Sequence, residues 1–207
     1  EIKLLMEKKQ FEKIEEALKN NSNAAFKQGI PALVLIELLM PENQFDKIIE
    51  KVLDNNVNAA FKQGTTALML AASMGKTSFV HTLLTKNADA NQQDCQQKLA
   101  LHYAIAAKQL KTATVLIAHT ANIDAPDKDG RTPLFYACLY NFYDIVPHLL
   151  ACQPDLTLID NQELSALNYA AIKGHLKILF SLVAAGHPID GLIKDKNKTD
   201  MLINSTP

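Results

Sequence analysis

The sequence has few of the residues that cross-link small secreted domains or form flexible linkers. Its three cysteines, Cys95, Cys138 and Cys152, are scattered and form no C-x-x-C pair, so they indicate neither a zinc site nor a disulfide framework. Glycine and proline number only 7 and 8 in 207 residues, which leaves little room for low-complexity segments. Because unpaired cysteines are typical of a reducing compartment, we predict a cytoplasmic location.

The sequence also lacks an excess of one charge sign and a long hydrophobic run. The 21 Lys and Arg residues balance 22 Asp and Glu residues, which argues against a nucleic-acid partner or an anionic membrane surface. The most apolar stretch, Ile30 to Met40, is interrupted by Glu37 and has about half the length of a membrane-spanning helix. We therefore expect no nucleic acid and no membrane insertion, although the 48% hydrophobic share is ample for a buried core.

A period of 33 residues organises what is present. It connects Leu68, Leu101, Leu134 and Leu167, then Ala71, Ala104, Ala137 and Ala170, and again Leu84, Ile117, Leu150 and Val183. The period holds over four consecutive units without a gap. Self-similarity of this kind predicts a solenoid in which each unit buries its apolar face against its neighbours.

Each unit predicts two short helices joined by a break. Hydroxyl residues that can cap a first helix stand at Thr66, Thr132 and Ser165, and residues that tolerate a left-handed backbone follow at Gly75, Asn141 and Gly174. The second helix then presents an inward apolar stripe, whose last members include Leu84, Leu150 and Val183.

The best-preserved unit contains Thr132-Pro133-Leu134 after the turn Asp127-Lys128-Asp129-Gly130, and Ala100-Leu101-His102-Tyr103-Ala104 and Gly174-His175 support the same pattern. This resembles the ankyrin repeat family, whose period is 33 residues and whose signature is T-P-L-H-x-A. The resemblance implies an all-α solenoid of helix–turn–helix units with short β-turn connections. It also implies a non-catalytic protein-binding module that needs no cofactor.

The repeat divides one domain, residues 1–207, into a series of units. We expect a partial repeat at 1–22, repeats at about 23–57, 58–90, 91–123, 124–156 and 157–189, and a partial repeat at 190–207. Asn23 to Gly29 recurs as Asn58 to Gly64 at a spacing of 35, so the N-terminal units have altered connections. Because both ends stop within a repeat, we expect a fragment of a longer protein.

The histidines and cysteines offer no catalytic pattern. The resemblance implies that His102 ties down the adjacent turn and that His175 starts a second helix. The other histidines are interpreted as solvated surface residues: His81, His119, His148 and His187. No H-x-x-x-H or H-E-x-x-H spacing supports a metal site. Cys138 replaces a small alanine and is predicted to be a buried packing residue, so we assign no catalytic and no metal-binding residues.

The resemblance places a binding surface on the turn tips and the exposed side of the first helices, which form a concave face in ankyrin arrays. Large apolar residues stand there on adjacent repeats, with two cations as a polar rim: Leu139, Tyr140, Leu164 and Ile172, with Arg131 and Lys173. Such a cluster at solvent-facing positions is typical of an interaction hot spot. The alternative is that these residues fill the seam between neighbouring first helices.

Three functional hypotheses follow. The first is a monomeric, non-catalytic module that binds a partner protein through the concave face. The second is the targeting or substrate-recruiting arm of a larger enzyme, or of a secreted bacterial effector acting on a host protein in host cytoplasm, with the catalytic domain elsewhere. The third, an enzyme using its own cysteine or histidine, predicts a reactive thiol. The full-length sequence distinguishes the second hypothesis from the first.

Overall fold

The computed structural model describes residues 57, 58, 60, 62–120 and 122–188, and the structural statements below concern these residues. The predicted partial repeats at 1–22 and 190–207 lie outside the described residues. So does the repeat at 23–57, apart from its last residue. The described chain therefore covers the four units in which the 33-residue period is strict.

The described helices alternate as the period predicts. The first helices are α6 (Ala67–Met74), α8 (Ala100–Ala106), α10 (Pro133–Leu139) and α12 (Ala166–Ile172). The second helices are α7 (Thr77–Thr85), α9 (Leu110–His119), α11 (Val146–Ala151) and α13 (Leu176–Ala184). Two 3₁₀ turns complete the described elements, η1 (Lys62–Gly64) and η2 (Tyr143–Ile145), and the bridge between Ile159 and Ser165 is isolated. The all-α repeat solenoid is confirmed.

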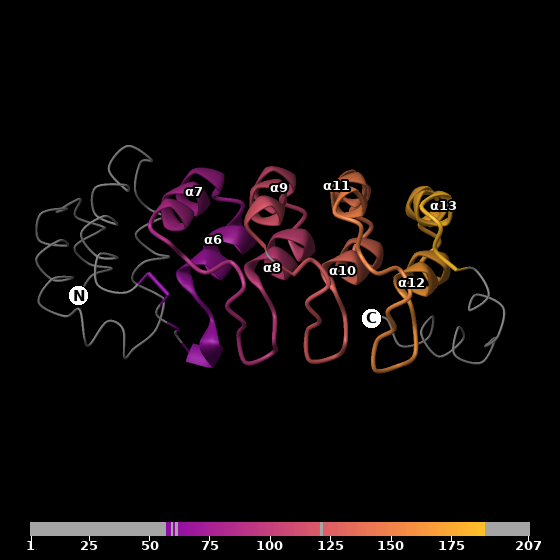
Figure 1. Ribbon diagram of the computed structural model, residues 1–207, viewed down its shortest axis with the longest axis horizontal. Helices are drawn as coiled ribbons and strands as arrows, with labels where there is room; N and C mark the ends of the chain where they lie inside the picture. The colour runs from indigo at the N-terminus through magenta and orange to yellow at the C-terminus, as the bar shows by residue number, and fades with distance from the viewer. Residues whose placement is uncertain (1–56, 59, 61, 121, 189–207) are drawn as a thin grey trace, which may run out of the picture.

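The helices form two rows with a third layer of long turns. Figure 1 shows α7, α9, α11 and α13 side by side in one row, the first helices in the row next to it, and the turns projecting from the opposite edge. This arrangement follows from the period, because each helix pair buries its apolar stripe against the next pair. Within the described residues, no helix has the length and hydrophobicity needed to cross a membrane.

Small residues in the first helices and leucines in the second helices form the core. The alanines of the period, Ala71, Ala104, Ala137 and Ala170, are each 0% exposed. Their lack of bulk lets neighbouring first helices approach closely. Leu83, Leu116, Leu149 and Leu182 are also completely buried, one in each second helix. Each such leucine contributes about 2 kcal/mol of hydrophobic stabilisation.

The breaks between paired helices adopt the left-handed backbone that the sequence predicts. The φ angles are +70° at Gly75, +54° at Asn141 and +69° at Gly174, and Lys108 occupies the same position with a φ of +55°. A side chain at Gly75 would collide with Gln109, whose Oε1 atom lies 2.1 Å from the position of an added Cβ. A larger residue there would have to displace the side chain of Gln109 in addition to adopting a left-handed backbone, which glycine adopts most readily.

Two local predictions were wrong in part. Thr66 and Ser165 accept hydrogen bonds from Met69 and Asn168 as expected, but the hydroxyl of Thr132 makes no capping bond. The start of α10 depends instead on Pro133, whose ring presets a helical φ angle. The predicted inward stripe also fails at Val183, which is 41% exposed.

His187 was predicted to be a solvated surface residue, and this was wrong because only 5% of its surface is exposed. The reason is its place in the period. Pro154 and Ala88, which occupy the equivalent position one and three repeats earlier, are also buried. The backbone N–H of His187 donates to the carbonyl of Leu182 at 3.0 Å, which folds the chain back over the end of α13 and turns this position inward.

Candidate binding surface

Three consecutive turns are built on aspartates spaced 33 residues apart: Asp94, Asp127 and Asp160. In the middle turn, Oδ1 of Asp127 accepts hydrogen bonds from the backbone N–H groups of Asp129 and Arg131, both at 2.9 Å. The other two aspartates make the same pair of bonds at 2.8 to 3.0 Å, to Gln96 and Lys98 and to Gln162 and Leu164. One carboxylate oxygen therefore fixes each turn.

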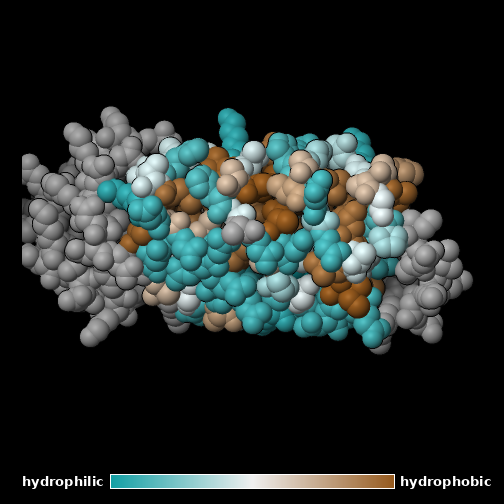
Figure 2. Space-filling model, viewed as in Figure 1, coloured by the Kyte–Doolittle hydropathy of each residue, from teal (hydrophilic) through white to brown (hydrophobic). Residues whose placement is uncertain are grey.

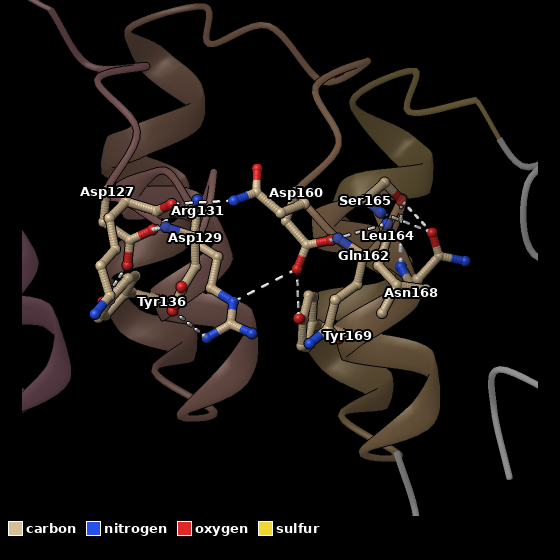
Figure 3. Close-up of polar contacts among 12 residues, drawn as sticks. Asp127, Asp129, Arg131, Tyr136, Asp160, Gln162, Leu164, Ser165, Asn168 and Tyr169 are labelled. Carbon is tan, nitrogen blue, oxygen red and sulfur yellow. Dashed lines mark hydrogen bonds and ion pairs between the residues drawn. The ribbon is translucent and has the colours of Figure 1, made fainter. Parts of the chain in front are cut away.

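The second oxygen of each aspartate binds a tyrosine of the first helix that follows. The hydroxyls of Tyr136 and Tyr169 donate to Oδ2 of Asp127 and Asp160 at 2.7 and 2.6 Å, and Tyr103 donates in the same way to Asp94. Figure 3 shows two of these pairs on neighbouring repeats. Burial, followed by the bond to Asp160, raises the pKa of Tyr169 to about 12, so the phenol remains a neutral donor. Each turn is thus locked to its own helix.

Backbone hydrogen bonds join the turns into a row. The N–H of Cys95 donates to Gln63, that of Lys128 to Gln96, and that of Asn161 to Asp129, each at 2.9 Å. The side-chain amide of Asn161 adds a bond to the carbonyl of Lys128 at 3.0 Å. The turn tips consequently keep a fixed spacing along the array.

Cations lie over the tyrosine rings of the next repeat. The Nζ atom of Lys98 is 5.6 Å from the ring centroid of Tyr136, and Cζ of Arg131 is 5.6 Å from that of Tyr169. The guanidinium of Arg131 also lies 3.5 Å from carboxylate oxygens of both Asp129 and Asp160, as Figure 3 shows for the two repeats that it joins. Arg131 is therefore fixed in place, and its charge is largely compensated.

His102 holds two adjacent units together, as the resemblance implies. Its Nδ1 atom accepts a hydrogen bond from the backbone N–H of Leu99 at 3.0 Å, and its Nε2 atom lies 3.3 Å from the carbonyl oxygen of Arg131 in the next turn. Since Nδ1 accepts, Nε2 carries the proton and donates. Burial lowers the pKa of His102 to about 4, so this neutral tautomer is maintained at neutral pH.

The predicted site residues differ in their accessibility. Tyr140 is 42% exposed, Ile172 and Lys173 are partly exposed, and Leu139 is partly buried against the core. Leu164 is only 6% exposed, so the prediction that it faces solvent was wrong. The side chain of Leu164 belongs to the buried core, whereas Arg131, at the same register position one repeat earlier, lies over the ring of Tyr169.

The exposed surface is mixed in character. Figure 2 shows hydrophilic residues over most of the edge where the turns lie, and hydrophobic residues exposed among the helices above it. The ring of Tyr140 lies 5.9 Å from that of Tyr136, whose hydroxyl is bound by Asp127. The exposed phenol of Tyr140 therefore rests on a side chain that is itself held in place.

Within the described residues, the cysteines and other ligating side chains form no cluster. All three cysteines are unpaired; Cys138 is buried, while Cys95 and Cys152 are exposed. Burial raises the pKa of the Cys138 thiol, which agrees with its predicted packing role. In the part of the chain that the structure describes, no group of three or more His, Cys, Asp or Glu side chains could hold a metal ion.

Sequence reasoning missed the aspartate–tyrosine pairs. Asp127 was interpreted only as part of a turn, and Tyr136 only as part of the repeat motif. The signal was nevertheless present, because both residue types recur with the 33-residue period, nine positions apart within each unit.

A family model described as ankyrin repeats, in three copies, matches residues 4–127 and 119–195 of the chain. No curated protein matches the chain at a significant level.

Proposed function

The chain belongs to the ankyrin repeat family, whose repeats generally mediate protein–protein interaction, and from this premise we propose that it is a non-catalytic module that binds a partner protein. The binding surface is the concave side expected in this family, here named the inner face: the turn tips and the exposed side of the first helices. It is formed by Arg131, Leu139, Tyr140, Ile172 and Lys173.

The exposure of Tyr140 is the observation that carries this proposal. A tyrosine supplies a large contact area with few rotatable bonds, and such residues are enriched at the energetic centres of interfaces. The ring of Tyr140 already lies 5.9 Å from that of Tyr136, which limits the rotamer entropy that binding would cost.

The hydrogen-bonded turns support the same conclusion. The row of 2.9 Å backbone bonds between successive turns keeps the inner face in a fixed geometry before any partner arrives. A surface that is already ordered loses little conformational entropy on association. Binding by this face therefore requires no folding step.

The proposal is tested by comparing Tyr140→Ser with Phe180→Ser. Both changes remove an exposed aromatic ring, but Phe180, which is 67% exposed, lies on the second helix α13 and outside the inner face. Each chain is immobilised and exposed to a soluble cell extract, and the retained proteins are quantified by mass spectrometry. We expect at least one protein to be retained by the parent and by Phe180→Ser, and its amount to fall tenfold or more with Tyr140→Ser.

Circular dichroism must first show that both variants are folded like the parent. Equal retention by Tyr140→Ser and the parent would contradict the inner face as the binding site. Loss of the same protein from Phe180→Ser alone would move the site to the second-helix row.

The alternative that this array is the recruiting arm of a larger enzyme, or of a secreted bacterial effector, uses the same inner face and differs in what is attached to it. The sequence of the full-length protein tests it, since a catalytic domain beside the array would support the arm. We further propose that the module works as a monomer in cytoplasm. The three unpaired cysteines, two of them exposed, support a reducing compartment.

A further inference from the structure

The first helices, like the second helices α7, α9, α11 and α13, contain no acidic residue. The sequences of the first helices are ALMLAASM, ALHYAIA, PLFYACL and ALNYAAI. Cations follow the ends of three of them, with Lys76 and Lys108 two residues after α6 and α8 and Lys173 directly after α12. The exposed side of the first helices therefore carries positive charge without negative charge from its own elements.

Lys108 and Lys173 flank Tyr140 on both sides. In the 33-residue register, Ala107, the residue before Lys108, is equivalent to Tyr140 one repeat earlier. Lys173 is equivalent to Tyr140 one repeat later. In the part of the chain that the structure describes, neither Lys108 nor Lys173 has a carboxylate within 4.0 Å. Burial and a bond to the carbonyl of Leu139 have the largest effects on the pKa of His175, and the charges of Lys173 and Lys108 come next. Both ammonium groups therefore lie in electrostatic range of this one ring beside α10.

The acidic groups of the adjoining turns are already engaged, and Asp144, four residues after Tyr140, lies in η2, which leads into the second helix α11. Asp127 and Asp160 are buried and each binds two backbone N–H groups and a tyrosine hydroxyl. Asp129 and Asp160 compensate the charge of Arg131, whereas Lys108 and Lys173 keep theirs. A partner that approaches Tyr140 consequently meets an aromatic ring between two uncompensated ammonium groups.

We propose that the inner face recognises an acidic protein segment that places carboxylates on either side of one apolar side chain. The apolar side chain packs against Tyr140, and the carboxylates pair with Lys108 and Lys173. This inference rests on the proposed function and specifies the partner's chemistry.

The spacing of the repeats sets the size of this segment. Neighbouring first helices pack at about 10 Å, so positions two repeats apart are separated by about 20 Å. An extended chain of about six residues spans that distance. Opposite charges at both ends also fix the register of the segment and accelerate its association. A nucleic acid fits less well, since two ammonium groups provide few phosphate contacts.

The test selects ligands without assuming a sequence. A phage-displayed library of random 12-residue peptides is selected on the immobilised full chain, and the enriched peptides are synthesised with a fluorescent label. Their affinity is measured by anisotropy for the parent, for Lys108→Glu with Lys173→Glu, and for the control Lys111→Glu with Lys177→Glu. The control changes the net charge equally but lies in the second helices α9 and α13.

We expect the enriched peptides to carry Asp or Glu on both sides of an aromatic or aliphatic residue. Their affinity should fall at least tenfold with Lys108→Glu and Lys173→Glu and less than twofold with the control. Peptides in which the acidic residues are replaced by lysine should regain binding to the Lys108→Glu, Lys173→Glu variant, which a merely destabilised fold would not produce. Thermal unfolding of each variant shows whether the fold is retained.

The remaining outcomes are separable. Neutral or basic peptides that require Tyr140 but tolerate the charge reversal would overturn this inference and leave the proposed function intact. Enriched peptides whose affinity is unchanged by Tyr140→Ser, or no enrichment over the bare support, would count against both. A 12-nucleotide single-stranded DNA that binds more tightly than the peptides, with the same loss on charge reversal, would overturn the acidic protein segment in favour of a nucleic acid.

Discussion

The turn network, formed by the three aspartate–tyrosine pairs, uses the same residues in each of its repeats, whereas the ends of the first helices use different ones. In the turn network, three repeats place the same two residue types at the same positions, an aspartate and a tyrosine nine residues later, with nearly identical hydrogen bonds. At the ends of the first helices, one register position holds a different residue in each repeat: Met74, Ala107, Tyr140 and Lys173. The first region is buried or half-buried, whereas Tyr140 in the second is exposed.

This difference separates the residues that stack the repeats from those available to a partner. A buried carboxylate with three hydrogen bonds cannot be removed without leaving donors unsatisfied, which accounts for its recurrence in these three repeats. An exposed position at the end of a helix has no such partners. Its residue can therefore change from repeat to repeat without disturbing the array.

The largest expected effect is in the turn network. Asp127→Ala removes the acceptor of two backbone N–H groups and of the Tyr136 hydroxyl, and we expect it to lower the free energy of unfolding by about 4 kcal/mol. Tyr136→Phe removes only one of these bonds and should cost about 1 kcal/mol. Urea unfolding followed by circular dichroism measures both.

The Lys108→Glu, Lys173→Glu variant provides the comparison at the exposed helix ends, with an expected change within about 0.5 kcal/mol. Should Asp127→Ala be no more destabilising than this surface variant, the distinction between the two regions would be lost.

A smaller effect is expected from the pH dependence of His102. Its pKa falls from 6.5 to about 4 on burial, so the folded chain binds a proton less readily than the unfolded chain. The corresponding stability is fully present above pH 6.5 and is lost as the pH falls towards 4, and it amounts to about 3 kcal/mol. Unfolding experiments between pH 7 and pH 4 measure this loss.

The variant His102→Asn isolates this contribution from that of other titrating groups. Asn168 occupies the same position two repeats later, where its Oδ1 accepts the N–H of Ser165 at 2.8 Å, so asparagine preserves the cap but does not titrate. We expect the variant to lose less stability than the parent over this pH range. Parallel curves would mean that His102 does not carry the pH dependence.

The smallest expected effect compares two helix caps. Thr66→Val removes a hydroxyl that accepts the N–H of Met69 at 3.3 Å and should cost about 1 kcal/mol. Thr132→Val removes a hydroxyl that makes no capping bond, so its change should stay within about 0.5 kcal/mol. Thermal unfolding of the two variants, measured side by side, tests this. Equal losses of stability would show that the capping bond of Thr66 does not distinguish the two positions.

Much of the fold could be predicted because its signals are local or periodic. The breaks at Gly75 and Gly174 were identified from residue type alone, since glycine adopts a left-handed backbone at little cost. The role of His102 followed from its place in the motif, and its bonds to Leu99 and Arg131 agree with it.

The candidate binding surface was harder to predict because exposure depends on neighbouring elements. Leu164 and Tyr140 both stood at nominally outward positions, yet one is buried and the other exposed. The bond between Asp160 and the N–H of Leu164 does not decide this, because Asp94 and Asp127 bind Lys98 and Arg131 in the same way. The apolar side chain of Leu164 packs into the core, whereas the two cations at its register position lie over tyrosine rings. Arg131 was expected to form part of a polar rim, but contacts with Asp129, Asp160 and Tyr169 hold it between two turns.

The sequence alone determined the 33-residue period, the paired helices and their breaks, because helix propensity, apolar spacing and glycine conformation act within one unit. Tertiary structure decided which side chains remain accessible. His187 is buried because the chain folds back over the end of α13, and Arg131 is held between Asp129 of its own turn and Asp160 of the next. Burial and the contacts between units are properties of the assembled array, and a single repeat does not contain them.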